Sequence, residues 1–178
     1  MLYMCLLTLL LLQQVSQASE PRHLRLAKSF LHVREVARNS SPDIDRWLQF
    51  VGLSSGNPYC AAYVSYIVHV SKVTEPRVRS GLARNFVTHR SVPATKVLMG
   101  MVVIPAGSVV IWRRGNTIFG HVGFTTQAWK GKTGFTIEAN TSSGAAGSQF
   151  DGNGVFQRTR SIVPGNAFRI TDFTLIQY

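Results

Sequence analysis

Cys60 is the residue of this sequence whose type and position most clearly suit it to chemistry. It stands in NPYCAAYVSYI, residues 57–67, and the only other cysteine of the chain is Cys5. Asn57 is a typical helix N-cap and Pro58 suits the first helical position, so a helix is predicted to begin there with Cys60 in its first turn. The positive end of a helix dipole favours the thiolate, the nucleophilic form of cysteine. The alternative is a buried small cysteine with a purely structural role.

His121 is the best candidate for the base that a nucleophilic thiol needs. It stands in FGHVGF at the predicted start of a strand, and Gly120 and Gly123 are expected to leave open space around it. The other four histidines lie on predicted helical stretches with polar neighbours, which is typical of surface or half-buried residues: His23, His32, His69 and His89.

Glu138 and Asn140 are the candidates for a group that orients the imidazole of His121. Both stand in TIEANTSSG, two positions apart on a predicted strand, so their side chains are expected on one face. The alternative for Glu138 is an ion pair with one of the many arginines. Asn140 also begins an Asn-Thr-Ser glycan acceptor pattern, but a sugar there would block the site. The order cysteine, histidine, carboxylate or amide follows the nucleophile, base and orienting group of thiol hydrolases.

The elements that must position these residues fall into two groups along the chain. Apolar residues at helical spacing predict helices in the first half, over residues 22–38, 42–51, 57–72 and 78–88. After Pro93, short β-rich stretches alternate with glycine-bearing turns and predict strands near residues 108–112, 122–126, 135–138, 155–159 and 168–177. Helices followed by strands predict an α+β domain in which the nucleophile helix packs on an antiparallel sheet.

The N-terminal segment is predicted to be a secretory signal. Leu6 to Leu12 form an apolar run that is too short to span a bilayer, and Ser16-Gln17-Ala18 provides small residues for cleavage after Ala18. An apolar N-terminus or an uncleaved anchor is the alternative. The expected domains are therefore a signal peptide, residues 1–18, and one hydrolase domain, residues 19–178, exported to the periplasm or outside the cell. No later stretch is apolar enough for a membrane span.

The charge of the chain limits its partners. Lysine and arginine number 19 against eight acidic residues, a formal net charge of +11. A basic exported protein is suited to an anionic polymer such as the cell wall, although scattered charge can serve solubility alone. Nucleic acid is not an expected partner, because aromatic–basic interleaving and helix-turn-helix patterns are absent. Neither a cofactor nor a metal is implied, since metal-ligand spacing is lacking, and a monomer is expected.

Three stretches together resemble the CHAP family of cysteine, histidine-dependent amidohydrolases and peptidases. They are GNPYCAAYVSYI, PAGSVVIWRRGNTIFGHVGF and TIEANTSSG, and they span roughly residues 52–145. The resemblance implies a papain-like, NlpC-like fold, with Cys60 as nucleophile and His121 as general base. By the same resemblance, Glu138 and Asn140 hold the imidazole. One departure is Gly107-Ser108, where the family usually has Gly-Asp.

The resemblance also implies a substrate. The family mostly cleaves peptidoglycan, at the amide between muramic acid and L-alanine or within the stem peptide. The expectation is therefore a secreted peptidoglycan amidase or endopeptidase. The alternatives are an antibacterial lytic effector or toxin with the same chemistry, and a non-catalytic wall-binding module on the same scaffold. Because the sequence has no wall-binding repeat, its positive charge is expected to hold it on the wall.

Overall fold

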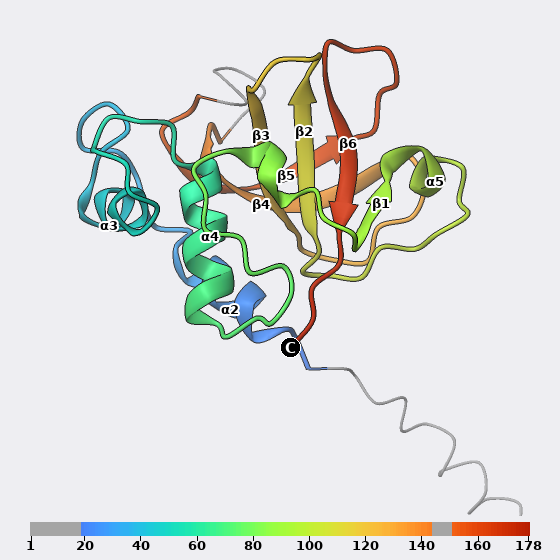
Figure 1. Ribbon diagram of the computed structural model, residues 1–178, viewed down its shortest axis with the longest axis horizontal. Coiled ribbons are helices and arrows are strands. Elements are labelled where there is room, and N and C mark those ends of the chain that lie inside the picture. Colours follow the sequence, from blue (N-terminus) through green and yellow to red (C-terminus); the bar gives the residue numbers. More distant parts are fainter. Residues whose placement is uncertain (1–18, 144–150) are drawn as a thin grey trace, which may run out of the picture.

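Three helices precede the sheet and pack beside it. The computed structural model describes residues 19–143 and 151–178, so the predicted signal segment, residues 1–18, lies outside the described residues. The helices are α2 (Arg22–Ser29), α3 (Pro42–Phe50) and α4 (Cys60–Val70). Figure 1 shows α3 and α4 to the left of the strands, with α2 below. Within the two described ranges, no helix combines the length and apolarity needed to cross a bilayer.

The first two helices differ in how well local sequence predicts them. The helix predicted over residues 42–51 is confirmed: Ser41 caps α3 by accepting a hydrogen bond from the backbone N–H of Ile44 at 3.4 Å. The helix predicted over residues 22–38 is wrong beyond Ser29. There the chain turns, Val33 is buried, and Arg34 forms an isolated antiparallel bridge with Gly154. Tertiary pairing therefore overrides the apolar periodicity of this segment.

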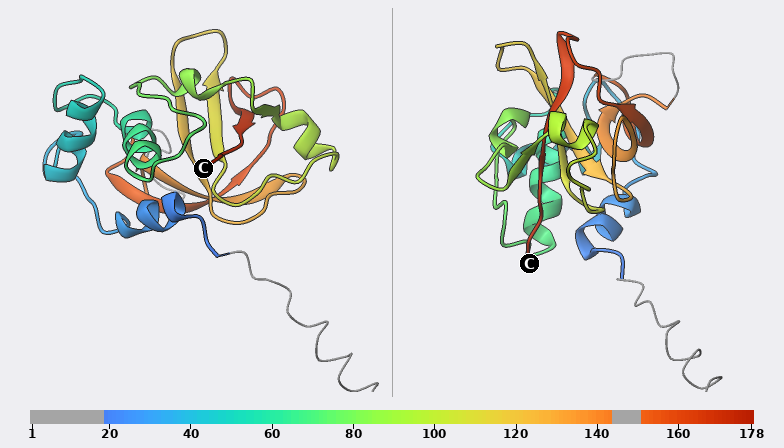
Figure 2. Two further views of the ribbon diagram at one scale, coloured as in Figure 1. Left: turned by 60° about the horizontal axis from the view of Figure 1, so that its bottom comes forward. Right: turned by 90° about the vertical axis from the view of Figure 1, so that its right-hand side faces the viewer.

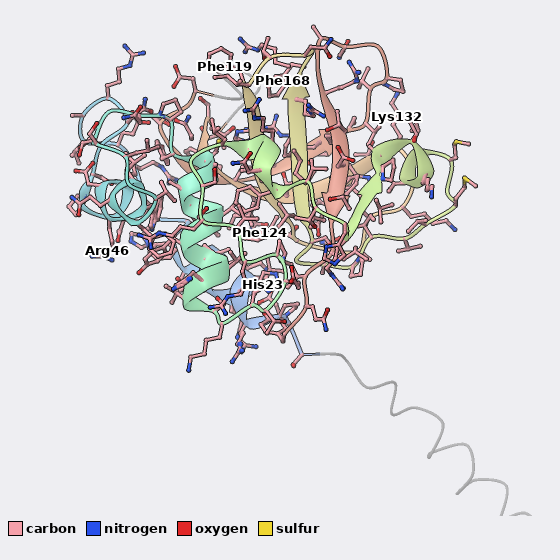
Figure 3. All side chains as sticks on the ribbon, in the orientation of Figure 1. His23, Arg46, Phe119, Phe124, Lys132 and Phe168 are labelled. Carbon is pink, nitrogen blue, oxygen red and sulfur yellow. The ribbon has the colours of Figure 1, made fainter. Side chains whose placement is uncertain are left out.

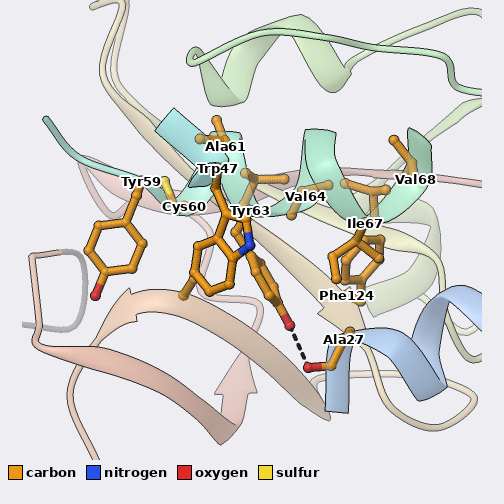
Figure 4. Close-up of a cluster of buried hydrophobic side chains, with 14 of the residues drawn as sticks. Ala27, Trp47, Tyr59, Cys60, Ala61, Tyr63, Val64, Ile67, Val68 and Phe124 are labelled. Atoms are coloured by element: carbon orange, nitrogen blue, oxygen red, sulfur yellow. Dashed lines mark hydrogen bonds between the residues drawn. The ribbon is translucent and has the colours of Figure 1, made fainter. Parts of the chain in front are cut away.

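Helix α4 begins at Cys60, three residues later than predicted. The side chain of Asn57 does not cap it, because its Nδ2 donates instead to the carbonyl oxygen of Ser54 at 3.0 Å. Cys60 is nevertheless in the first turn, as predicted. Figure 4 shows the remaining turns of α4 inside the core, where the Tyr63 hydroxyl donates to the carbonyl oxygen of Ala27 at 2.9 Å.

The segment between α4 and the sheet contains little of the predicted helix. Residues 78–88 form only one 3₁₀ turn, η1 (Ala83–Phe86), so the helix predicted there is wrong. The short strand β1 (Ser91–Pro93) and the short helix α5 (Ala94–Leu98) follow it and were not predicted. Both owe their form to the sheet edge: β1 pairs with the last strand of the chain, and α5 covers that strand.

The predicted antiparallel sheet is confirmed. Within the described residues it has six strands in the order β1-β6-β2-β3-β4-β5, and every neighbouring pair is antiparallel. The five strands after β1 are β2 (Val109–Arg114), β3 (Gly120–Thr125), β4 (Thr133–Thr141), β5 (Gly154–Ser161) and β6 (Phe168–Thr174). Figure 2 shows the sheet from two further directions, and in its left view α3 and α4 lie at the left and α5 at the right. The chain is an α+β protein.

The sheet is buried on both faces, which fixes its position against α4. Along β2, Val109 and Ile111 belong to the helical core, whereas Val110 and Trp112 belong to a second apolar cluster beneath α5. This packing brings the N-terminal end of α4 next to the start of β3, at the top of Figure 1. The first turn of α4 and the first residues of β3 therefore lie side by side.

The turn before β2 tolerates its departure from the usual Gly-Asp sequence. The Ser108 hydroxyl donates to the carbonyl oxygen of Pro105 at 2.9 Å, and its backbone N–H donates to the Thr125 hydroxyl at 3.1 Å. The carbonyl oxygen of Gly107 lies 2.7 Å from Nε2 of His23. His23 is thus buried and hydrogen-bonded, and its prediction as a surface or half-buried residue is wrong.

Candidate active site

Glu138 and His121 form a buried hydrogen-bonded pair between neighbouring strands. His121 is the second residue of β3, and Nε2 of its ring lies 2.8 Å from Oε2 of Glu138 on β4. Both side chains are completely buried. The contact leaves the second ring nitrogen, Nδ1, unused by Glu138, and the same imidazole interacts with Cys60. His121 therefore connects the thiol of α4 to a carboxylate inside the sheet.

Gly123 makes this pairing possible. In the β3–β4 ladder Gly123 is the direct partner of Glu138. A Cβ atom at position 123 would lie 2.7 Å from Cγ of Glu138 and 2.6 Å from the carbonyl oxygen of Ile137. The space that the glycines of FGHVGF were expected to leave open is thus filled by the Glu138 side chain, which crosses Gly123 to reach the imidazole.

Two side chains besides His121 hold the carboxylate of Glu138. Arg160 on β5 donates from Nε to Oε1 at 2.8 Å and from Nη2 to Oε2 at 2.5 Å, and the Thr136 hydroxyl donates to Oε1. Burial raises the pKa of Glu138, but the hydrogen bonds from Arg160 and His121 outweigh it and lower the pKa to about 2. Glu138 is therefore ionised at neutral pH.

The environment of His121 favours the imidazolium form. Burial lowers its pKa, but hydrogen bonding and charge interaction with Cys60, followed by those with Glu138, raise it to about 9. The ring is also fixed from the side, because the indole of Trp112 packs edge-to-face against it with ring centroids 5.2 Å apart. An imidazolium held beside a thiol stabilises the thiolate form of that thiol.

Cys60 opens onto a groove on the surface. The cysteine is 6 % exposed and forms part of the floor of a cavity of about 470 Å³. The walls come from three segments: the end of α3 with the loop after it, the chain around η1, and the turn between β2 and β3. The lining residues are Val51, Leu53, Asn57, Pro58, Cys60, Arg79, Ser80, Gly81, Leu82, Ala83, Ile118, Phe119 and Gly120. A substrate lying in this groove reaches the thiol.

The family comparison agrees with this arrangement. The family model of the CHAP domain matches residues 52–140, which is half of the chain. The chain belongs to the CHAP domain family. CHAP domains are amidases and peptidases that act on peptidoglycan, and the matched range contains Cys60, His121, Glu138 and Asn140. Among curated proteins and solved structures, no match was found.

Asn140 stands at an irregular point of this CHAP domain. Its φ of 59° is left-handed, and the β4–β5 register shifts between Ala139 and Thr141. This interrupts the regular alternation on which the expected shared face with Glu138 rested. Its backbone N–H hydrogen-bonds the hydroxyl of Tyr59, the residue before Cys60. A contact between the Asn140 side chain and the imidazole stays a prediction.

Arg160, Thr136 and Tyr59 are site residues that sequence reasoning missed. An ion pair with an arginine was considered for Glu138 only as an alternative to a place in the site, whereas Glu138 binds Arg160 and His121 together. The alternation of Arg158 and Arg160 near the end of a predicted strand was the available signal. The hydroxyl of Tyr59 donates to Oε1 of Glu35 at 3.1 Å, and burial, followed by the Glu35 carboxylate, raises its pKa.

The described part of the chain offers no obvious metal centre. Within residues 19–143 and 151–178, no group of three or more histidine, cysteine, aspartate and glutamate side chains is arranged to hold a metal ion. A thiol beside an imidazolium that is paired with a carboxylate is suited to attack on a carbonyl carbon.

Proposed function

We propose that this protein is an exported peptidoglycan hydrolase in which Cys60 is the nucleophile and His121 the general acid and base. The bond cleaved is an amide, either between muramic acid and L-alanine or within the stem peptide. The observation that supports this most strongly is the continuous connection from Cys60 through His121 to Glu138, with Cys60 at the floor of a groove.

The first half of the reaction forms a thioester. The Cys60 thiolate adds to the amide carbonyl carbon, and the developing oxyanion accepts a hydrogen bond from the backbone N–H of Cys60. That N–H belongs to the first turn of α4 and has no acceptor within the helix. The carbon–nitrogen bond then breaks, and the His121 imidazolium gives its proton to the leaving amine.

The second half releases the acyl group. Neutral His121 takes a proton from water as the water oxygen attacks the thioester carbon, and the sulfur leaves as a thiolate. His121 is then an imidazolium again, which restores the starting ion pair. Glu138 stabilises the imidazolium and orients the ring, and Arg160 acts as a positioning residue that keeps Glu138 ionised.

Export and targeting complete the proposal. Cleavage after Ala18 releases a mature chain that keeps the net charge of +11, because residues 1–18 carry no charged side chain. This charge attracts the protein to an anionic wall, an interaction that salt screens over a Debye length of about 8 Å at physiological ionic strength. Binding to whole wall should therefore weaken as salt rises, whereas hydrolysis of a small soluble muropeptide should change much less.

Mass spectrometry of fragments released from purified peptidoglycan tests the proposal. Muramic acid free of peptide, with new L-alanine N-termini, identifies an amidase, whereas new termini inside the peptide identify an endopeptidase. The Cys60→Ala protein is the matched control and should release neither. A wild-type protein that binds the wall but releases no fragment contradicts the proposal and favours the non-catalytic wall-binding module.

A further inference from the structure

Arg79 is the one charged side chain in the wall of the groove. The lining contains no aspartate, glutamate, lysine or histidine. Arg79 also lacks a carboxylate partner within the described residues, where the ion pairs are Lys28–Glu20, Arg46–Asp43, His121–Glu138 and Arg160–Glu138. The groove thus presents an arginine whose charge is not matched by the protein that surrounds it.

The guanidinium of Arg79 is held in place at the groove rim. Its Nε donates to the carbonyl oxygen of Phe50 at 2.5 Å, and its Cζ lies 4.5 Å from the centre of the Phe50 ring. Phe50 is itself packed edge-to-face against Tyr66, with centroids 5.8 Å apart. Because Nε is occupied and the plane is fixed on an aromatic ring, the two Nη groups remain as donors. An arginine preorganised in this way suits a planar carboxylate.

Apolar side chains make up much of the rest of the groove lining. Leu82, Ile118 and Phe119 line the groove and are 38 %, 49 % and 64 % exposed. Figure 3 shows Phe119 at the top of the molecule, beyond the start of β3. A substrate that fits this groove carries small apolar groups together with an anionic group.

The size of the groove limits how far the anion lies from the bond that is cleaved. The cavity volume of about 470 Å³ equals that of a sphere roughly 10 Å across, which is the length of about three extended residues. Arg79 and Cys60 line the same cavity. A carboxylate bound by Arg79 therefore belongs to a residue within about three residues of the scissile amide.

We propose that Arg79 forms a carboxylate-binding subsite that selects peptides with a free carboxylate close to the scissile bond. This inference rests on the proposed function and adds a substrate requirement to it. Peptidoglycan stem peptides offer two such groups: the α-carboxylate of a γ-linked D-glutamate and the carboxylate at the peptide C-terminus. Both have the same chemistry, and amidation of either one removes its charge while hardly changing its shape.

Hydrolysis of three soluble muramoyl peptides tests the subsite. One has both carboxylates free, one has the glutamate α-carboxylate amidated, and one has the C-terminus amidated. We expect amidation of the group that Arg79 binds to lower kcat/KM about tenfold or more, as for loss of a charge-assisted hydrogen bond. The sensitive peptide identifies which carboxylate is bound.

Variants of Arg79 connect that preference to the residue. Arg79→Gln should lower kcat/KM on the fully free peptide by the same factor and leave the sensitive amidated peptide unchanged. Arg79→Lys should give an intermediate loss, because a lysine keeps the charge but not the two-pronged geometry. Arg77→Gln is the matched control: this exposed arginine lies outside the groove lining, and its removal changes the net charge equally. It should have no effect on the preference.

Titration of the same peptides into the Cys60→Ala protein separates this inference from the proposed function. If the wild type cleaves none of the three but the Cys60→Ala protein binds the free peptide more tightly than an amidated one through Arg79, the hydrolase proposal fails and the subsite stands. Equal kcat/KM and equal binding for all three peptides overturn the subsite. A preference that survives in Arg79→Gln, or disappears in Arg77→Gln, overturns it as well.

Discussion

The two sides of the candidate active site are built in opposite ways. On the sheet, Glu138 is completely buried and receives hydrogen bonds from Arg160, Thr136 and His121. On the helix, Cys60 is placed by the backbone at the start of α4 and is packed among apolar neighbours. The sheet side therefore has its charges fixed by buried hydrogen bonds, whereas the helix side presents one small thiol among apolar neighbours.

This difference separates activity from stability. A buried charge that loses a partner destabilises a protein strongly, because the remaining charge is neither hydrated nor paired. A small sulfur atom at a helix start can be exchanged for oxygen with little change in volume. Substitutions on the helix side should therefore lower activity alone, whereas substitutions on the sheet side should lower stability as well.

The largest effect is expected at Cys60. Cys60→Ser should lower kcat on the order of 10⁴-fold or more, as for loss of the nucleophile in a catalytic unit whose members act together. Its Tm should stay within about 2 °C of the wild type, because the substitution leaves no large cavity and no buried charge. Fragment release and thermal denaturation of the same preparation check both parts. A Cys60→Ser protein that keeps wild-type turnover contradicts a nucleophilic role for this residue.

Glu138→Gln should damage stability as well as activity. It removes the charge that Arg160 and His121 both bind, and Arg160 can recover only part of its hydration because its side chain is 11 % exposed. We expect a loss on the order of 3 kcal/mol in the free energy of unfolding. Urea denaturation with linear extrapolation measures it.

Asp43→Asn is the matched control for Glu138→Gln. It removes the partner of Arg46 in a surface ion pair, where the two side chains are 26 % and 57 % exposed. The same loss of one negative charge should cost less than about 1 kcal/mol there. Equal losses at the two positions would show that the buried cluster does not stabilise the sheet as we describe.

The pH dependence of stability should show two limbs that report on the same cluster. The pKa of Glu138 is lowered from 4.5 to about 2, so its contribution to the free energy of unfolding is present above pH 4.5 and lost as pH falls through about 2. The pKa of His121 is raised from 6.5 to about 9, so its contribution to the free energy of unfolding is present below pH 6.5 and lost as pH rises through about 9. Midpoints of urea denaturation between pH 2 and 10 should be highest between these limbs.

The alkaline limb also tests the link between the two sides. Cys60 is the first of the interactions that raise the pKa of His121. Cys60→Ala should therefore move the alkaline fall to lower pH, and His121→Gln should abolish the contribution of the imidazolium. An alkaline limb that is identical in all three proteins would mean that His121 is not paired with Cys60.

Sequence reasoning succeeded where local chemistry decides the structure. The helix over residues 42–51, the first-turn position of Cys60 and the strands around His121 and Glu138 all follow from neighbouring residues. It failed where distant segments decide: Val33 and Arg34 leave the helical pattern to meet β5, and residues 78–88 form one turn beside β2. Arg160 was missed for the same reason, because its pairing with Glu138 depends on the register of β4 and β5, which no local pattern specifies.

The smallest effect is expected at Asn140, where conformation and chemistry can be separated by two substitutions. One imidazole nitrogen of His121 binds Glu138 and the other faces Cys60, so we expect the Asn140 side chain to add little to proton transfer. Asn140→Gly removes the side chain and accepts the φ of 59° without strain. Its kcat/KM should fall less than about tenfold, below the 10² to 10⁴ typical of a proton-transfer group.

Asn140→Ala removes the same chemistry but retains a Cβ atom in a left-handed conformation. It should therefore lose about 1 kcal/mol in the free energy of unfolding relative to Asn140→Gly, while its kcat/KM matches that of the glycine variant. Paired kinetics and urea denaturation distinguish the two effects. If both variants lose activity a hundredfold or more and Asn140→Gly remains as stable as the wild type, the side chain of Asn140 does hold the imidazole, and the sheet side supplies a second orienting group beside Glu138.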